Sequence, residues 1–189
     1  MRKILFVLVL VVAVLAGAVF VLDRLDLLTP IAANGTASMA TALPACNGRE
    51  LAEGFTYRFR DPHRGEIVAF HTSGSVADGT VRPDSHGGSL LTKRVIGVPG
   101  DTVTVHSRRV YVDGIKTDDI ETAPFTAVKL DPHQYFVLGD NRSFSHDSRE
   151  FGAVPRSAIF GRVILVWWPL KHVGAPGARG SGPPPGNVC

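Results

Sequence analysis

The sequence has little of what several classes of protein site require. It contains two cysteines, Cys46 and the terminal Cys189, and seven histidines that are scattered along the chain. Metal sites of the zinc type need closely spaced Cys or His ligands, so neither a metal nor a metal cofactor is expected. The positions of the two cysteines do not decide whether they pair in an oxidising compartment.

Charge of one sign and internal repetition are also sparse. The formal net charge is +3, and no basic block is interleaved with aromatic residues. Nucleic acid is therefore not an expected partner. No internal repeat is visible, and helical periodicity is weak after the N-terminal segment.

One long apolar run is present at the N-terminus. Residues 4–22 carry no charged side chain and follow Arg2 and Lys3. A helix of that length spans roughly 28 Å, close to the hydrocarbon core of a bilayer. The alternative is a cleaved signal peptide, whose apolar region is shorter and ends at a small-x-small site. We expect a retained transmembrane helix, with the basic pair favouring a cytoplasmic N-terminus.

Short runs typical of β-strands dominate the rest of the chain. They alternate apolar and polar residues, or are rich in β-branched and aromatic ones, and turn residues separate them. The predicted strands are residues 55–59, 66–70, 90–98, 101–105, 109–112, 134–138 and 159–168. Residues 71–89 are rich in Gly, Ser and Asp and are expected to form a surface loop. The predicted fold class is mainly β, an antiparallel ectodomain with one N-terminal transmembrane helix.

Composition divides the chain into five expected segments. A cytoplasmic N-terminus precedes the transmembrane helix, a linker, a β-domain and a Gly/Pro-rich tail. Their respective bounds are 1–3, 4–22, 23–29, 30–172 and 173–189. The tail is expected to be disordered because it has too few apolar residues to form a core.

Lys93 stands near the head of an apolar run that ends in the turn signal Pro99-Gly100-Asp101. Burial on a strand would disfavour the charged amine and lower its pKa from about 10.4. A lysine brought to roughly 7–8 is a competent general base. The alternative is a lysine that snorkels at a strand edge, since lysine is rarely buried.

A serine hydroxyl becomes a nucleophile when a base takes its proton, and a desolvated lysine can be that base. Ser38 is the candidate nucleophile, in a stretch of small residues beyond the anchor; taken alone, it is also typical of an ordinary loop serine. Residues 137–152 form a polar loop that is either functional or simply solvated. The charged residues that could lock this loop through ion pairs are Asp140, Arg142, Asp147 and Arg149.

Four segments carry a more specific pattern. They are Ser38-Met39, Arg64-Gly65-Glu66-Ile67-Val68, residues 93–101, and Gly139-Asp140-Asn141-Arg142 followed by Ser145-x-Asp147-Ser148-Arg149-x-Phe151-Gly152. In this order they resemble the conserved boxes of type I signal peptidases, the Ser/Lys leader peptidases. The resemblance covers about residues 33–168 plus the anchor. It implies the signal-peptidase/LexA-like antiparallel β fold.

The resemblance implies a role for each matching residue. Ser38 matches the nucleophile and Lys93 the general base. Thr36 matches a hydroxyl of the oxyanion hole, where the backbone N–H of Ser38 would be the second donor. Ser145 matches the serine that orients the lysine. The remaining matches are the supporting groups Asp147 with Arg149, and Asp140 with Arg94.

The implied activity is that of a serine endopeptidase that needs no cofactor. It would cut signal peptides from secreted preproteins at Ala-x-Ala-like sites, on the outer face of the plasma membrane. The membrane lipid surface would be a second partner. Met39, Trp167 and Trp168 are candidates for contact with it, although the tryptophans could equally pack in the core.

Three alternatives remain open at this point. LexA-type self-cleaving repressors share a Ser/Lys dyad, but they carry a DNA-binding helix-turn-helix where this chain has an anchor. A peptidase specialised for one substrate is the second alternative. The third is a non-catalytic β-domain for binding. Its one support is that Thr41 stands where the family usually has a proline, which would stiffen the segment after the nucleophile.

Overall fold

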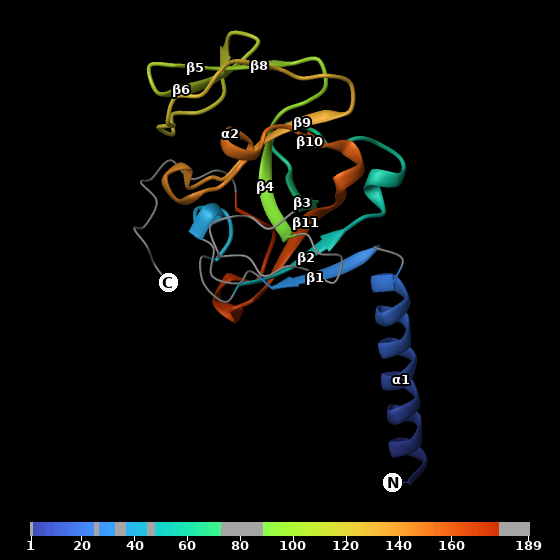
Figure 1. Ribbon diagram of the computed structural model, residues 1–189. Coiled ribbons are helices and arrows are strands. Elements are labelled where there is room, and N and C mark those ends of the chain that lie inside the picture. The colour runs from blue at the N-terminus through green and yellow to red at the C-terminus, as the bar shows by residue number, and fades with distance from the viewer. Residues whose placement is uncertain (1, 25–26, 33–36, 45–47, 73–88, 178–189) are drawn as a thin grey trace.

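The structure is a computed structural model, and it describes residues 2–24, 27–32, 37–44, 48–72 and 89–177. Helix α1 (Arg2–Arg24) extends away from a β-rich body (Figure 1). The strands of that body pair antiparallel throughout the described residues. The predicted fold class, mainly β with one N-terminal apolar helix, is confirmed.

Helix α1 is long and apolar enough to cross a membrane. None of its segment Arg2–Val21 is buried against the rest of the protein. An apolar surface of this extent is unfavourable in water and suits a lipid environment. The helix extends beyond the predicted span at both ends, and β1 (Leu28–Ala32) begins inside the predicted linker.

The larger sheet has seven strands in the order β1-β2-β11-β3-β4-β9-β10. Its strands other than β1 are β2 (Arg49–Glu53), β3 (Ile67–Thr72), β4 (Ser89–Gly97), β9 (Gln134–Leu138), β10 (Val154–Pro155) and β11 (Ile159–Trp168). The predicted strands at 66–70, 90–98, 134–138 and 159–168 are therefore confirmed. Strand β4, which carries Lys93, lies between β3 and β9.

The smaller sheet has the order β7-β6-β5-β8 and lies at the end of the body opposite α1 (Figure 1). It comprises β5 (Thr102–His106), β6 (Arg109–Val112), β7 (Ile115–Lys116) and β8 (Val128–Lys129). The predicted hairpin of residues 101–105 and 109–112 is confirmed by the pairing of β5 with β6. An apolar cluster joins the two sheets, with Ile96, Phe136 and Leu138 packed near Val103 and Val110.

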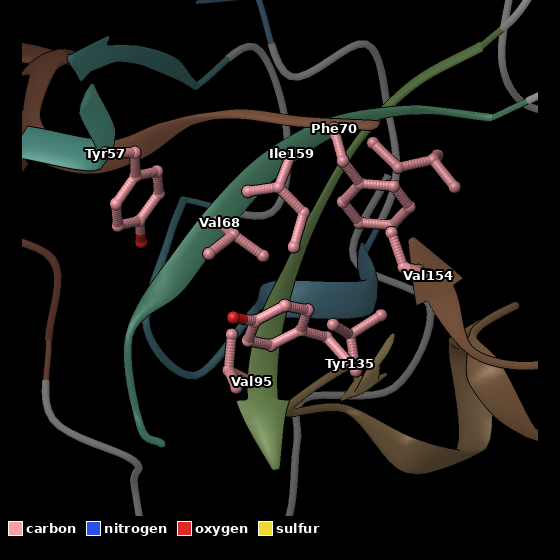
Figure 2. Packing of buried hydrophobic residues seen from close by; sticks show 9 residues of the cluster. Tyr57, Val68, Phe70, Val95, Tyr135, Val154 and Ile159 are labelled. Carbon is pink, nitrogen blue, oxygen red and sulfur yellow. The ribbon is translucent and has the colours of Figure 1, made fainter. Parts of the chain in front are cut away.

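The core of the larger sheet fixes β4 from one side. Figure 2 shows Val68, Phe70, Val95, Tyr135 and Ile159 converging from four strands. Each of these side chains is at most 3 % exposed. Burial of this kind stabilises by roughly 1.5–3 kcal/mol per large apolar side chain, so β4 is a rigid platform.

The strand predicted at residues 55–59 is wrong. This segment contains a 3₁₀ helix, η2 (Thr56–Arg58), in place of a strand. The Glu53 carboxylate accepts a hydrogen bond from the Thr56 N–H at 2.9 Å, which satisfies a donor at the start of the turn. The Phe55 and Phe59 rings meet on the outside, 4.9 Å apart, while Tyr57 points inward. The apolar spacing is thus that of a helical turn.

The tail was expected to be disordered from residue 173 onward, but its first residues make ordered backbone contacts. Gly174 forms a β-bridge with Val166, and the Gly177 N–H donates to the Ala42 carbonyl at 3.0 Å. These backbone bonds place residues 174–177 beside the segment that follows Ser38. Residues 178–189, most of the predicted loop 71–89, and both cysteines lie outside the described residues.

Candidate active site

Ser38 lies in a short 3₁₀ turn, η1 (Ala37–Met39), and is 3 % exposed. The turn is closed by the Ala40 N–H, which donates to the Ala37 carbonyl, and by the Leu43 N–H, which donates to the Met39 carbonyl. The Met39 and Leu43 side chains pack into a cluster whose other buried members are Ile67, Val163 and Val166. Small residues allow this tight turn, and the two large ones fix it to the sheet.

Lys93 is 3 % exposed and lies opposite Val68 in the pairing of β4 with β3. Its Nζ donates a hydrogen bond to Ser38 Oγ at 2.9 Å. This contact joins residues that are 55 positions apart in the chain. The structure therefore brings the predicted nucleophile and the predicted base together. When the amine is neutral, the same geometry lets it accept the serine proton.

The loop after β9 contacts the backbone of the nucleophile Ser38. The Asn141 N–H donates to the Ser38 carbonyl at 2.9 Å. Gly139 lies at the point of closest approach: a Cβ added there would be 2.2 Å from Ser145 Oγ and 2.7 Å from the Ser38 carbonyl oxygen. Only glycine fits between these groups.

Asp147 is fully buried and organises this loop. Its carboxylate accepts hydrogen bonds from the Gly139 N–H at 2.9 Å and from Ser145 Oγ at 2.6 Å. It also caps the short helix α2 (Ser148–Phe151) in a capping box with Glu150. The Arg149 guanidinium binds both oxygens, at 2.7 and 2.9 Å. Burial lowers the pKa of Arg149, but these bonds outweigh it and raise that pKa above its ordinary value.

Arg94 and Asp140 form a second buried pair beside the dyad. The Arg94 guanidinium donates twice to the Asp140 carboxylate, at 2.8 and 2.7 Å, and once to the Gly65 carbonyl at 2.6 Å. A two-pronged contact of this kind fixes the orientation of both groups. It ties the strand of Lys93 to the loop that touches Ser38.

The chain matches the family model described as signal peptidase, peptidase S26, over residues 2–168. It belongs to the signal peptidase family. A probable signal peptidase I-2 of Synechocystis sp. is 41 % identical over 133 residues, which are 68 % of this chain and 58 % of that protein. Signal peptidase I of Leptolyngbya laminosa is 35 % identical over 144 residues, 74 % of this chain and 66 % of the relative.

A solved signal peptidase I structure, from Enterococcus faecalis V583, aligns with 55 % of this chain and 97 % of its own at 26 % identity and a TM-score of 0.40. The chain spans about 58 % and 66 % of the lengths of the Synechocystis and Leptolyngbya relatives. Membership of the family rests on the match of the family model over residues 2–168.

No described contact tests two of the expectations taken from the signal peptidase pattern. Thr36 lies outside the described residues. Ser145 Oγ donates to Asp147, so its expected contact with the Lys93 amine stays a prediction. Among the described residues, no group of three or more His, Cys, Asp or Glu side chains could hold a metal ion.

Arg142 was expected to help lock its loop through ion pairs, and it does so with a partner from outside that loop. Its guanidinium donates to Asp118 at 2.7 Å and to Thr122 Oγ1 at 2.6 Å, and its Nε donates to the Gly139 carbonyl at 3.0 Å. Asp118 and Thr122 come from the long connection before β8. The acidic residues of this connection indicate that a basic side chain pairs with them, but they do not identify which one.

Glu50 was also missed by the sequence reasoning. Its side chain on β2 is 1 % exposed, and within the part of the chain that the structure describes neither carboxylate oxygen has a hydrogen-bond partner. Burial raises the pKa of Glu50 from 4.5 to about 7, and the attraction of Lys93 opposes part of that rise. The segment around Glu50 does not alternate clearly in the sequence, so burial of this carboxyl was not foreseeable.

Proposed function

We propose that this chain is a membrane-anchored serine endopeptidase that cleaves signal peptides from exported preproteins at Ala-x-Ala-like sites. The observation that carries the proposal is the 2.9 Å contact between Lys93 Nζ and Ser38 Oγ, buried within the conserved-box pattern of the family. A buried, neutral amine beside a serine hydroxyl can act as the general base that takes the hydroxyl proton.

The reaction proceeds in two stages. Neutral Lys93 accepts the proton of Ser38 as Oγ attacks the scissile carbonyl, and the resulting ammonium then protonates the departing amine. This leaves an ester on Ser38 and a neutral lysine. Lys93 next takes a proton from water, the hydroxide attacks the ester, and the proton returns to Ser38 Oγ. Thr36 and the Ser38 N–H are the proposed donors to the oxyanion in both stages.

The supporting groups hold this geometry. Ser145, fixed by Asp147, orients the Lys93 amine, and the Asp147–Arg149 pair keeps the loop in place. The pair of Arg94 with Asp140 does the same on the strand side. Preorganised groups of this kind are what keep a nucleophile and a base within reach of each other.

An extended substrate has a free strand edge to bind. The pairing of β4 with β3 runs from Ser89 to Arg94, whereas its pairing with β9 begins only at Arg94. Among the described residues, the part of β4 that precedes Arg94 therefore has a strand partner on one side alone. A substrate strand added there would form main-chain hydrogen bonds next to Lys93.

The proposed membrane anchor would hold the active site close to preproteins that emerge from the membrane. Arg2 and Lys3 favour a cytoplasmic N-terminus, so the β-body would lie on the outer face of the plasma membrane. Trp167 and Trp168 are 40 % and 44 % exposed, which favours contact with lipid over packing in the core. Met39, in contrast, is 3 % exposed and packs within the protein.

The test uses the full-length chain in detergent micelles or proteoliposomes, with a preprotein as substrate. Ser38→Ala and Lys93→Ala should each lower the cleavage rate at the signal junction by about 1,000-fold or more. The exposed residues Ser157 and Lys171 provide matched controls, and Ser157→Ala and Lys171→Ala should cleave at the wild-type rate. Near-normal turnover by Lys93→Ala would overturn the dyad assignment.

A further inference from the structure

Residues 173–177, called the strap below, return from the end of β11 toward the turn that carries Ser38. After β11 the short 3₁₀ turn η5 (Leu170–His172) reverses the direction of the chain. Gly174 then pairs with Val166 of β11 through two backbone hydrogen bonds of 2.8 and 3.0 Å. Gly174 has a φ of 152°, which side-chain-bearing residues rarely adopt. The strap is thus fixed to the larger sheet.

The strap also bonds directly to the segment after the nucleophile. The Gly177 N–H donates to the Ala42 carbonyl at 3.0 Å. A Cβ built on Gly177 would lie 3.6 Å from the Ala42 Cα and 3.7 Å from the Thr41 carbonyl oxygen, so the two backbones run close together. Val166, the partner of the strap on β11, packs in the apolar cluster that includes Met39. The red end of the coloured ribbon passes beside the light-blue turn η1 (Figure 1).

The segment 40–43 has few other hydrogen bonds to hold it. Its backbone N–H groups that donate do so within the turn, to the carbonyls of Ala37 and Met39. Thr41 Oγ1 is buried and finds no hydrogen-bond partner in the described part of the chain. Thr41 also stands where the signal peptidase pattern has a proline, so that constraint on the backbone is absent. Among the residues that the structure describes, only the Gly177 N–H ties this segment to the chain outside the turn by a backbone hydrogen bond.

Two backbone N–H groups from distant segments therefore hold the nucleophile turn. The Asn141 N–H donates to the Ser38 carbonyl, and the Gly177 N–H donates to the Ala42 carbonyl four residues later. Asn141 belongs to the conserved-box pattern, whereas the match of the family model ends at residue 168. The family pattern consequently assigns no role to the second tie.

We propose that the strap positions Ser38 for attack, with the Gly177 N–H as its positioning group. The inference rests on the proposed function, because it concerns the placement of Ser38 Oγ relative to the Lys93 amine. With the strap bonded, the turn is tied at its end as well as at Ser38. With the strap detached, the turn keeps its apolar packing but gains freedom to move. Misplacement of a reacting group slows the chemical step without removing the main-chain bonds that bind a substrate.

Steady-state kinetics of the full-length chain in detergent micelles, with a signal-junction peptide, test the proposal. Proline has no N–H and fixes φ near −65°, so the double variant Gly174→Pro/Gly177→Pro loses both donors of the strap and the φ of Gly174. A displacement of about 1 Å costs roughly 100-fold in rate, and because the turn retains its packing we expect kcat to fall by about tenfold. KM should stay within about twofold of the wild-type value, since the edge of β4 is untouched. A wild-type kcat, or a raised KM with unchanged kcat, overturns the proposal.

A conservative variant at the same position is the matched control. Gly177→Ala keeps the N–H, and its Cβ would find only ordinary contacts, so it should cleave at the wild-type rate. Gly177→Pro alone removes one of the two donors and should lower kcat by about threefold, half of the loss in the double variant on a logarithmic scale. An equal loss in Gly177→Ala would mean that bulk at this position and not the hydrogen bond is responsible, which contradicts the proposal.

The rate at which a penem acylates Ser38 separates positioning from a merely structural role. Denaturant titration first establishes that the double variant is folded under the assay conditions. The folded variant should then be acylated about tenfold more slowly than the wild type, in step with its kcat. Acylation at the wild-type rate by a folded variant overturns the proposal. If the double variant does not fold, the comparison of Gly177→Pro with Gly177→Ala decides by the same measurement.

The proposed function fails separately from this inference. If Ser38→Ala cleaves the peptide in the same assay, the dyad is wrong and the strap has no nucleophile to position. If Ser38→Ala is silent while the proline variants keep the wild-type kcat, the dyad stands and the role of the strap is refuted.

Discussion

The turn that carries Ser38 and the loop that carries Asp147 meet at one backbone hydrogen bond, but different interactions hold them. Around the turn, the contacts are apolar side chains and short backbone bonds. Around the loop, they are buried ion pairs, with Arg149 on Asp147, Arg142 on Asp118, and Arg94 on Asp140. Apolar packing therefore holds the turn of the nucleophile, whereas buried ion pairs hold the loop beside the base.

This difference assigns separate sensitivities to the two regions. Apolar packing depends on volume and shape, so the turn should respond to cavities and be indifferent to neutralising substitutions. Buried ion pairs respond strongly to the loss of one partner, because the other is left as an uncompensated charge.

The largest expected effect comes from the charged loop. Asp147→Asn removes the charge that Arg149 needs and weakens the acceptor for Ser145 and the Gly139 N–H. Loss of one partner in a buried pair costs about 3–5 kcal/mol of unfolding free energy, which denaturant titration would measure. The exposed pair of Lys116 with Asp119 is the control, and Asp119→Asn should leave the midpoint unchanged. Equal effects at the two sites would mean that burial does not make the Asp147–Arg149 pair more important than an exposed pair.

The second-largest effect is expected at Gly139, where the turn of Ser38 and the loop of Asp147 are in contact. Gly139→Ala would place a Cβ 2.2 Å from Ser145 Oγ and 2.7 Å from the Ser38 carbonyl, so the loop must move away from the nucleophile. A displacement of about 1 Å in an active site costs roughly 100-fold in rate, so kcat should fall by that order. Gly177→Ala is the comparison, since its added Cβ would find only ordinary contacts at 3.6 Å. Full activity in Gly139→Ala would show that the contact is not needed for catalysis.

The smallest of the three effects concerns the apolar side. Met39→Ala leaves a cavity among Leu43, Val163 and Val166 and should cost about 2–3 kcal/mol of unfolding free energy. Denaturant titration would measure this loss. Ile115→Ala, at a residue that is 72 % exposed, controls for the loss of apolar side-chain atoms. A loss near zero for Met39→Ala would mean that apolar packing does not hold the turn.

Much of the fold followed from local patterns. The strands from β3 to β11 that were predicted lie in strongly β-branched runs whose pattern agrees with their packing. Residues 55–59 show the limit of this reasoning, because alternation over five residues does not distinguish a strand from a turn that exposes Phe55 and Phe59. The Glu53 carboxylate accepts a hydrogen bond from the Thr56 N–H in that turn, a contact that the alternation does not indicate.

The site was predictable where a residue's chemistry is unusual in its local context. A lysine within a β-branched run is unusual, and it indicates a candidate general base. A loop rich in Asp and Arg indicates ion pairs. The contact of Lys93 with Ser38 spans distant segments and emerged only from the family pattern and the fold. The burial of Glu50 and the choice of Asp118 by Arg142 depend on how the sheets close, which no local pattern encodes.

The rate at which a serine-reactive acyl probe, such as a penem, modifies the full-length chain tests the central claim most directly. Mass spectrometry should find one acyl group on Ser38 in the wild type, and none in Lys93→Ala over the same time, because the hydroxyl there has no base. Acylation of Ser38 in Lys93→Ala at the wild-type rate would contradict the account.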